Sequence, residues 1–303
     1  MSAIGIGTYL GNADEATDSS YTESIVRAVQ LGDNVIDSAA NYRFQRSERS
    51  IGRALEKLTN GLGFSREELV ICTKGGYLPF DGAPPRNVRE YVEETFVKPG
   101  IASFGDIAGG SHCMTPAYLE NQLQQSLRNM NLECVDVYYI HNPESQLGEI
   151  AQPDFYERLK LAFERLEENR RDGKLAHYGV ASWNGFRVAS DSGGHHSLVR
   201  MIEIAREVGG ERHGFHFVQL PLNLAMQEAI TVKNEKLHGE SLTVVEAAEK
   251  LGVAVIASAS LLQGRINPRT AIEFMQSTPG ITTALIGMSR VDHVEENLTT
   301  ELL

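Results

Sequence analysis

The chain has 303 residues, which is long enough for two medium domains or for one large barrel. Its 40 acidic and 28 basic side chains give a net charge of -12, which argues against a nucleic acid or an anionic membrane as partner. Three unpatterned cysteines indicate a reducing compartment, and no apolar stretch is long enough for a membrane span or an export signal, so we expect a cytoplasmic protein.

Short apolar runs rich in β-branched residues predict strands, and helical patterns separate them. Eight such runs occur, at residues 3–8, 34–38, 69–73, 135–140, 177–181, 215–220, 253–258 and 283–287. Strands that alternate with helices over this length predict a (β/α)8 TIM barrel that occupies residues 1–303 as a single domain. The alternative is a doubly wound open sheet.

Capping residues mark where several helices begin. The signals are Ser20 with Glu23, Thr115 with Pro116, and Thr243 with Glu246. Each pairs a side chain that accepts a hydrogen bond with a residue suited to the first helical turn. We therefore predict a helix start at each of these three places.

One connection is unusually long, because residues 77–111 separate the third predicted strand from the next helix. Loops of this length in a compact domain are commonly lids, binding loops or disordered segments. A helix is plausible at residues 88–97. His112 and Cys113, at the end of the segment, are interpreted as incidental, and His195 with His196 as part of a solvated loop.

Polar side chains occur where several predicted strands end, and in a barrel the active site lies at those ends. Asp37 ends the second strand and is followed by Tyr42, whereas Lys74 and His141 end the third and fourth strands. Gln219 ends the sixth. These five side chains are therefore expected to converge on one mouth of the barrel.

The chemistry of this set favours proton delivery to a carbonyl. Tyr42 has a phenol whose pKa in water is near 10, and an adjacent ammonium such as Lys74 is expected to lower that pKa. A buried Lys74 needs a counter-ion, which Asp37 would supply. His141 would orient the substrate oxygen by a hydrogen bond.

These residues resemble the aldo-keto reductases over essentially the whole chain and in order. The motifs that carry the resemblance are "GIGTYLG" (5–11), "DSAANYRFQRSERSIGRAL" (37–55), "VICTKGG" (70–76), "VDVYYIHNPE" (135–144), "SASLLQG" (258–264) and "IGMSRVDHVEENL" (286–298). The resemblance implies a (β/α)8 barrel and an NADP-dependent oxidoreductase that interconverts an aldehyde, ketone or sugar with its alcohol.

The resemblance also implies roles for particular residues. Tyr42 would act as general acid or base during hydride transfer, supported by Asp37, Lys74 and His141, and Gln219 would hold the nicotinamide carboxamide. The cofactor positions that it implies are Thr8, Tyr9, Asp37, Ser182, Gln219, Leu222, Ser258, Ser260, Leu261, Gly264, Met288, Ser289, Arg290, His293, Glu296 and Asn297.

The chain departs from the family pattern around the expected cofactor. Ala181 and Ser182 replace the usual serine and asparagine, so a contact to the carboxamide is lost unless Ser182 or Asn184 replaces it. Leu222 replaces a stacking aromatic residue, and His293 replaces an arginine near the 2′-phosphate. NADP(H) is expected to be preferred, with NAD(H) as the alternative.

Two other functions remain open at this point. The departures are compatible with a nicotinamide-binding redox sensor or regulatory subunit that has little turnover. Lys74 would also suit a Schiff-base lyase, although a neighbouring Asp37 that keeps it protonated argues against this. No metal is expected, because His141 and Glu144 lack a third ligand at credible spacing.

Overall fold

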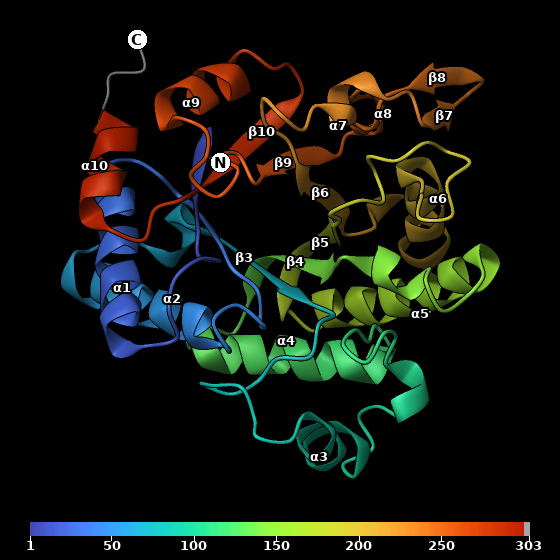
Figure 1. The fold of residues 1–303 in the computed structure, drawn as a ribbon, viewed down its shortest axis with the longest axis horizontal. Coiled ribbons are helices and arrows are strands. Elements are labelled where there is room, and N and C mark those ends of the chain that lie inside the picture. Colours follow the sequence, from blue (N-terminus) through green and yellow to red (C-terminus); the bar gives the residue numbers. More distant parts are fainter. Residues whose placement is uncertain (300–303) are drawn as a thin grey trace.

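Eight parallel strands close into a barrel in the computed structural model, which describes residues 1–299 (Figure 1). In barrel order they are β1 (Ile4–Gly7), β10 (Ile281–Gly287), β9 (Ala254–Ser258), β6 (Phe215–Pro221), β5 (Leu175–Ala181), β4 (Val135–His141), β3 (Val70–Gly75) and β2 (Val35–Asp37). Every strand end lies within two residues of the predicted run. The barrel is confirmed and the open sheet is wrong, while residues 300–303 of the expected domain lie outside the described residues.

Helices cover the outside of the barrel (Figure 1). They are α1 (Glu15–Gln30), α2 (Arg46–Glu56), α4 (Pro116–Met130), α5 (Gln152–Arg171), α6 (Leu198–Gly209), α8 (Val244–Leu251), α9 (Pro268–Gln276) and α10 (Val291–Thr299). Between β6 and α8 lie the short helix α7 (Glu228–Thr231) and a hairpin of β7 (Glu235–Leu237) and β8 (Glu240–Leu242). Within residues 1–299, no helix combines the length and hydrophobicity that a membrane crossing needs.

Two of the three predicted helix starts are confirmed. Thr115 precedes α4, whose first residue is Pro116, a position where the missing N–H of proline costs nothing. Thr243 caps α8 with a complete capping box: its hydroxyl accepts a hydrogen bond from the Glu246 N–H (3.2 Å), and its own N–H donates to the Glu246 carboxylate (2.8 Å).

The predicted start at Ser20 is wrong. Helix α1 begins six residues earlier, at Glu15, because the Asp14 carboxylate accepts a hydrogen bond from the Thr17 N–H (2.8 Å) and so caps the helix. Ser20 lies inside α1, and its hydroxyl donates to the Ser289 carbonyl (2.6 Å). That bond fixes the segment that follows β10 against α1.

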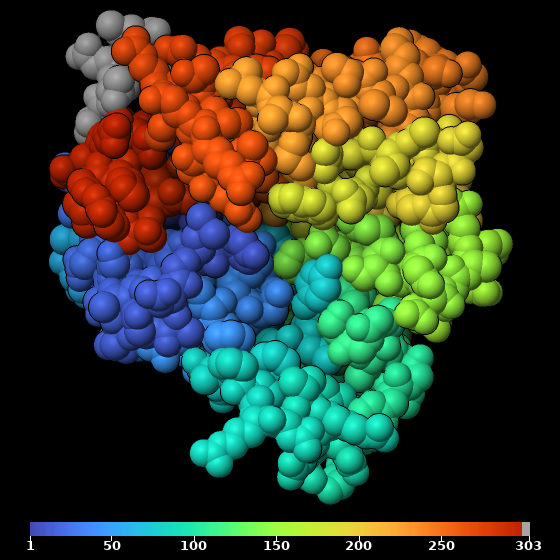
Figure 2. Space-filling view, in the orientation of Figure 1, coloured from blue at the N-terminus to red at the C-terminus, as the bar shows by residue number. Residues whose placement is uncertain are grey.

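The long connection after β3 is an ordered appendage rather than a lid. It contains the predicted helix as α3 (Val88–Val92), which continues as a wider helical turn (Glu93–Val97). An apolar cluster of its own packs it against α4, made by Leu78, Val92, Phe96, Ala102, Cys113 and Tyr118. The segment projects at the lower edge of the molecule in Figure 2.

His195 and His196 are buried, so the prediction that they belong to a solvated loop is wrong. The His196 ring stacks on Phe155 (ring centroids 5.9 Å apart) and meets Phe186 edge-on (4.5 Å). Neither of its ring nitrogens has a hydrogen-bond partner among the described residues. Burial, reinforced by His195, lowers the pKa of His196 to about 3.

This burial predicts a loss of stability in acid. The pKa of His196 is lower in the folded chain than its unfolded value near 6.5, so its contribution is fully present above pH 6.5 and is lost as the pH falls toward 3. Between pH 6.5 and 5, the residue should remove about 2 kcal/mol from the free energy of unfolding, at about 1.4 kcal/mol per unit. Urea unfolding at several pH values measures this slope.

The matched variant is His196→Leu, which keeps the site apolar. His196→Leu should reduce the dependence of the free energy of unfolding on pH between 6.5 and 5. At pH 8 imidazoles are neutral in both states, so the difference in unfolding free energy between the variant and the wild type there measures the change in packing alone. An unchanged acid slope in the variant would show that another group causes the loss.

Candidate active site

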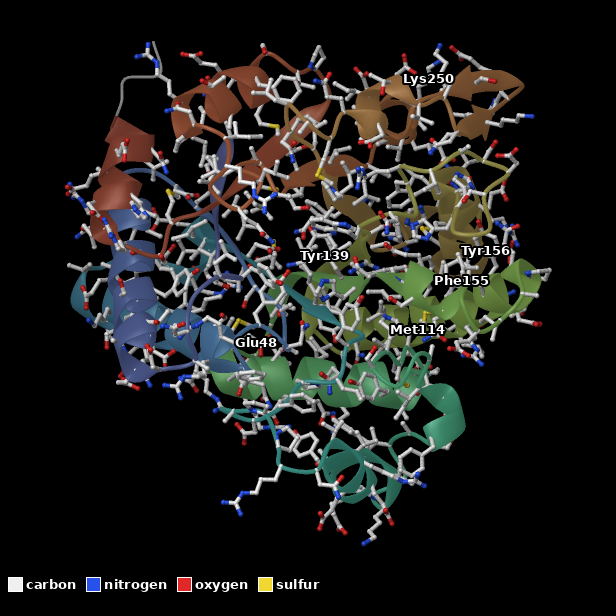
Figure 3. The ribbon with its side chains drawn as sticks, viewed as in Figure 1. Glu48, Met114, Tyr139, Phe155, Tyr156 and Lys250 are labelled. Atoms are coloured by element: carbon white, nitrogen blue, oxygen red, sulfur yellow. The ribbon has the colours of Figure 1, made fainter. Side chains whose placement is uncertain are left out.

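The inward-facing residues form layers inside the barrel, because side chains two positions apart on a strand point the same way. An apolar cluster fills the barrel interior and includes Val35, Cys72, Val137, Tyr139, Ala181, Ile256 and Leu285, with Tyr139 near the centre of Figure 3. Two residues beyond Val35, Cys72, Tyr139 and Phe217 come Asp37, Lys74, His141 and Gln219. Strand alternation thus places the four predicted polar residues in the layer above, at the C-terminal mouth.

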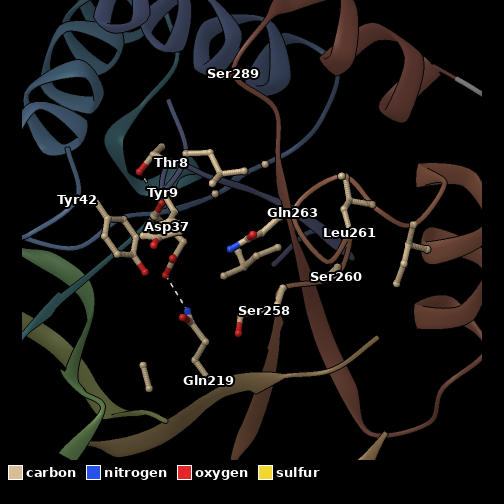
Figure 4. Close-up of a pocket in the computed structure, with 18 of the residues that line it drawn as sticks. Thr8, Tyr9, Asp37, Tyr42, Gln219, Ser258, Ser260, Leu261, Gln263 and Ser289 are labelled. Atoms are coloured by element: carbon tan, nitrogen blue, oxygen red, sulfur yellow. Dashed lines mark hydrogen bonds between the residues drawn. The ribbon is translucent and has the colours of Figure 1, made fainter. Parts of the chain in front are cut away.

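Asp37 and Lys74 form a buried ion pair at the base of this mouth. The Lys74 Nζ lies 2.5 Å from Asp37 Oδ1 and 2.7 Å from the Ser38 carbonyl oxygen, and both charged side chains are at least 95% buried. Gln219 Nε2 donates to the other carboxylate oxygen of Asp37 (2.8 Å; Figure 4). The carboxylate therefore joins β2, β3 and β6 across the barrel interior.

The two charged groups stabilise each other against burial. Burial by itself lowers the pKa of Lys74, but the attraction of Asp37 and Tyr42 outweighs it, and the pKa of Lys74 is raised. Burial raises the pKa of Asp37, while Lys74 and the Gln219 hydrogen bond oppose that rise. Lys74 thus keeps its proton at neutral pH.

Tyr42 lies beside this pair. The Lys74 Nζ is 4.9 Å from the centre of the Tyr42 ring, and Tyr9 meets the ring edge-on with centroids 4.9 Å apart. Burial raises the pKa of the Tyr42 phenol, and Lys74 only partly offsets this. Lys74 therefore acts on this pKa in the expected direction, but burial outweighs it and the pKa stays above its ordinary value.

A strained turn holds Tyr42 in place. The next three residues, Arg43, Phe44 and Gln45, all have positive φ (48°, 58° and 70°), a conformation that L-residues with side chains rarely adopt. The Arg43 guanidinium fixes the turn: it pairs with the buried carboxylate of Asp18 and donates to the Asn12 carbonyl (2.9 Å). Strain of this kind clusters at functional sites.

His141 faces Tyr42 across the mouth. The two rings meet edge-on with centroids 5.8 Å apart, and Tyr77 contacts the opposite side of the imidazole at 5.1 Å. Burial, Lys74 and His112 together lower the pKa of His141, so the ring is neutral at neutral pH. Its Nδ1 is buried without a hydrogen-bond partner among the described residues.

A cavity of about 500 Å³ extends from these residues to the N-terminal end of α10 (Figure 4). The predicted site residues that line it are Thr8, Tyr9, Asp37, Tyr42, His141, Ser182, Gln219, Ser258, Ser260, Leu261, Gly264, Ser289, His293, Glu296 and Asn297. Strands that are far apart in the sequence thus bring fifteen predicted residues to one cavity.

Four predicted residues lie elsewhere. Lys74 is behind Asp37, and Leu222 and Met288 are fully buried in the core around the barrel. Leu222 follows the end of β6, where its N–H donates to the Ser258 carbonyl (3.1 Å), and its side chain packs in the core and is not among the cavity lining. Arg290 lies on the surface, where it pairs with Asp292.

The cavity also has lining residues that the sequence did not single out for it. They include Leu10, Tyr21, Asn142, Trp183, Gln263, Ile266 and Pro268. Tyr9, Leu10 and Trp183 are exposed at the cavity (58%, 43% and 44%). The only indication of most of these lining residues in the sequence was that they lie within or next to the motifs. By contrast, none of residues 76–115 is among the lining residues.

The segment after β5 has its own hydrogen bonds. The Ser182 hydroxyl accepts from the Gly185 N–H (2.9 Å), and the N–H groups of Trp183 and Asn184 both donate to the buried carboxylate of Glu144 (2.7 and 2.8 Å). Ser182 still lines the cavity, whereas Asn184 does not. Of the two proposed replacements for the carboxamide contact, only Ser182 is therefore in position.

The far end of the cavity fits an anionic cofactor through backbone and hydroxyl groups. Leu262, Gln263 and Gly264 have consecutive positive φ values (46°, 57° and 82°), and the Ser260 hydroxyl is buried without a partner among the described residues. Ser289 and His293 lie at the N-terminus of α10, where backbone N–H groups favour anions. Neither Lys nor Arg occurs among the described lining residues, so His293 is their nearest substitute.

Comparison with known proteins now identifies the family. The aldo/keto reductase family model matches residues 3–271. This chain is an aldo/keto reductase. The resemblance predicted from the sequence motifs is thereby confirmed, and the match covers the strand ends that carry Asp37, Lys74, His141 and Gln219.

Individual relatives of this aldo/keto reductase are distant. A Schizosaccharomyces pombe protein whose assigned name is voltage-gated potassium channel subunit beta is 23% identical over 98% of this chain and 84% of its own. The NADH-specific methylglyoxal reductase of Escherichia coli is 25% identical over 60% of this chain and only 48% of its own length.

Solved structures share the fold of this aldo/keto reductase. An aldo-keto reductase from Klebsiella pneumoniae in complex with NADPH has a TM-score of 0.62 at 16% identity, with 98% of this chain and 84% of that chain covered. A thermostable aldo-keto reductase in complex with epalrestat has a TM-score of 0.64 at 18% identity, with 100% and 91% covered.

Proposed function

We propose that this protein is an NADP(H)-dependent reductase of an aldehyde or ketone, with Tyr42 as the proton donor. The observation that supports this most directly is the position of the Tyr42 ring between the Lys74 ammonium and the His141 imidazole at the cavity. A bound nicotinamide would supply the hydride for the carbonyl carbon. The protein residues would then deliver the proton to the carbonyl oxygen.

Each residue has a role that follows from its surroundings. Tyr42 carries a proton at neutral pH because its pKa is raised by burial, and the Lys74 ammonium stabilises the phenolate that forms when the proton leaves. Asp37 holds Lys74 in place and keeps it charged. The neutral His141 offers a hydrogen bond to the substrate oxygen, opposite Tyr42.

Residues at both ends of the cavity would hold the cofactor. Gln219 uses one amide N–H on Asp37, so its Oε1 and its second N–H are left for the nicotinamide carboxamide, and Ser182 also lines the cavity. Ser258, Ser260 and the left-handed run at 262–264 would receive the phosphates. Solved relatives with NADP or NADPH bound support this choice of cofactor.

The 2′-phosphate is the group that distinguishes NADPH from NADH, and Arg290 is the cation next to the cavity residue Ser289. Arg290→Leu should weaken NADPH binding about fivefold, in the range of an exposed charge-assisted contact, and leave NADH binding within about twofold. Asp292→Asn should have the opposite effect on NADPH, because Asp292 competes for the guanidinium. Nucleotide fluorescence titration at low salt measures both constants.

A matched control for these variants is Arg200→Leu, since Arg200 forms an exposed pair with Glu203 on α6 and neither of its chain neighbours lines the cavity. It should leave both dissociation constants unchanged. An equal loss of NADPH and NADH binding in Arg290→Leu would remove Arg290 from the 2′-phosphate site.

The proposed reaction is tested by NADPH consumption with a panel of aliphatic, aromatic and sugar aldehydes. Steady turnover on at least one class supports it. Tight NADPH binding without turnover on any class would contradict the reductase and favour a redox sensor or regulatory subunit, for which the relative named as a channel subunit is the specific support. In that case bound NADPH would be oxidised once, slowly, without cycling.

The Schiff-base lyase is disfavoured by the state of Lys74. A nucleophilic amine must lose its proton, but attraction to Asp37 keeps the pKa of Lys74 raised. No borohydride-trapped adduct on Lys74 is expected with any carbonyl substrate.

A further inference from the structure

We propose that His112, Gln146 and Arg158 form a positioning relay that holds His141 in its working orientation. The relay starts in the long connection after β3 and in α5, and it reaches the site only through the backbone of His141. The inference rests on the proposed function of His141 and adds to it three residues that do not line the cavity.

A chain of hydrogen bonds connects Arg158 to the backbone of His141 through Gln146 and His112. Arg158 Nη1 donates to Gln146 Oε1 (2.6 Å), and Gln146 Nε2 lies 2.8 Å from His112 Nδ1. His112 Nε2 in turn lies 2.7 Å from the His141 carbonyl oxygen. His112 and Gln146 are completely buried, so water does not compete for the bonds from Gln146 to His112 and from His112 to His141, whereas Arg158 is half-buried.

Arg158 determines, through Gln146, which ring nitrogen of His112 carries the proton. Its guanidinium only donates, so the Gln146 oxygen must face Arg158, and the Gln146 NH₂ group must face His112. The same NH₂ group also donates to the His112 carbonyl (3.1 Å), which excludes the flipped amide. His112 Nδ1 is therefore the acceptor, and the ring proton lies on Nε2, aimed at His141.

Burial supports this assignment, because it lowers the pKa of His112 to about 4 and keeps the ring neutral with a single N–H. That N–H has one partner, the His141 carbonyl. The ring thus has a fixed tautomer and a fixed donor direction.

The His141 carbonyl needs such a partner because β3 ends too early to provide one. The last register pair between the two strands is Gly75 with Ile140, and at Gly76 the chain turns away with φ +147°. A Cβ on Gly76 would lie 2.7 Å from His112 Nε2 and 2.9 Å from the His141 oxygen, so only glycine leaves room for this bond. The His112 side chain supplies the hydrogen bond that a longer β3 would give to the His141 carbonyl.

The long connection also forms a backbone hydrogen bond to Gly76, next to the end of β3. The Cys113 N–H donates to the Gly76 carbonyl (2.9 Å), and the Tyr77 ring lies edge-on between His112 (5.2 Å) and His141 (5.1 Å). The returning end of the connection is therefore packed directly behind the His141 ring. The segment acts on the site from behind, without covering it.

The experiment compares four variants for the ring ¹⁵N shifts of His112 and His141, the dissociation constant of NADPH, and kcat with a carbonyl substrate. Gln146→Glu keeps the size of the side chain but accepts where Gln146 donates, so it should move the His112 proton to Nδ1. His112→Leu removes the donor, and His112→Gln supplies an amide N–H in the place of Nε2. His196→Leu is the matched control, because it removes another fully buried imidazole.

The relay predicts that Gln146→Glu and His112→Leu shift the His141 ring signals and lower kcat at least about tenfold, as expected for a misplaced active-site group. NADPH binding should stay within about twofold. His112→Gln should recover kcat to within about threefold of the wild type, and His196→Leu should leave the His141 signals and kcat unchanged.

Three outcomes would overturn the relay: a wild-type His112 proton on Nδ1, unchanged His141 signals in His112→Leu, or a tautomer change in Gln146→Glu with full kcat. The ¹⁵N shifts need no substrate, so they judge the relay even if the wild type reduces no carbonyl. Absence of wild-type turnover would overturn the proposed reaction instead.

Discussion

Tyr42→Phe should lower kcat for carbonyl reduction by about 10²- to 10⁴-fold, the usual contribution of a positioned general acid. The phenylalanine ring preserves the contacts to Tyr9 and Lys74, so the cavity should keep its shape and bind NADPH within about twofold of the wild type. Only the proton donor is lost. Steady-state kinetics together with fluorescence titration of NADPH separate the two effects.

Tyr156→Phe is the control for this variant. The Tyr156 hydroxyl accepts a hydrogen bond from the Ser197 N–H (3.0 Å) outside the cavity, so its loss should leave kcat within about twofold. Retention of kcat in Tyr42→Phe would show that another group donates the proton, and the assignment of Tyr42 would then be wrong.

Lys74→Met should reduce the free energy of unfolding by about 3–5 kcal/mol, because it leaves the buried Asp37 carboxylate without its counter-ion. It should also reduce kcat strongly, since the phenolate of Tyr42 loses the ammonium that stabilises it. Urea unfolding at pH 7 measures the first effect, and steady-state kinetics measures the second.

The double variant Asp37→Asn with Lys74→Met separates stability from catalysis. It removes both buried charges, and an asparagine still offers an oxygen to Gln219, so much of the stability should return while kcat stays low. If Lys74→Met alone were as stable as the wild type, Asp37 would be protonated in the folded chain and the ion pair would not exist as described.

The sequence predicted the barrel and its polar mouth because both depend on local patterns. Each strand is a short apolar run, and alternation along it decides which residue is inward. Asp37, Lys74, His141 and Gln219 therefore follow from their positions at strand ends. The Ser20 signal failed because Asp14 offers a competing cap six residues earlier, and local pattern alone did not rank the two.

Other features depend on contacts between distant segments and were not predictable in the same way. The pKa of Tyr42 is raised because burial outweighs Lys74, and burial depends on Tyr9 and the packing of the whole mouth. His112 was interpreted as incidental, since nothing in its neighbourhood reveals that the chain returns to the end of β4. Leu222 follows a strand end as the motif requires, but its side chain joins the core.

The packing of the long connection divides it into two parts that tolerate mutation differently. Its base, at Gly76 and at residues 111–113, shares hydrogen bonds with the end of β4, so insertions or substitutions there would disturb the site. Residues 80–82 are bonded to the turn that holds Tyr42, because the Gly82 N–H donates to the Phe44 carbonyl (2.9 Å) and Gln45 Nε2 donates to the Phe80 carbonyl (3.1 Å). The tip at residues 83–86 is largely exposed and does not line the cavity. A peptide tag or a reporter domain inserted at the tip would therefore leave the barrel intact, which gives protein engineers an attachment point near the active site.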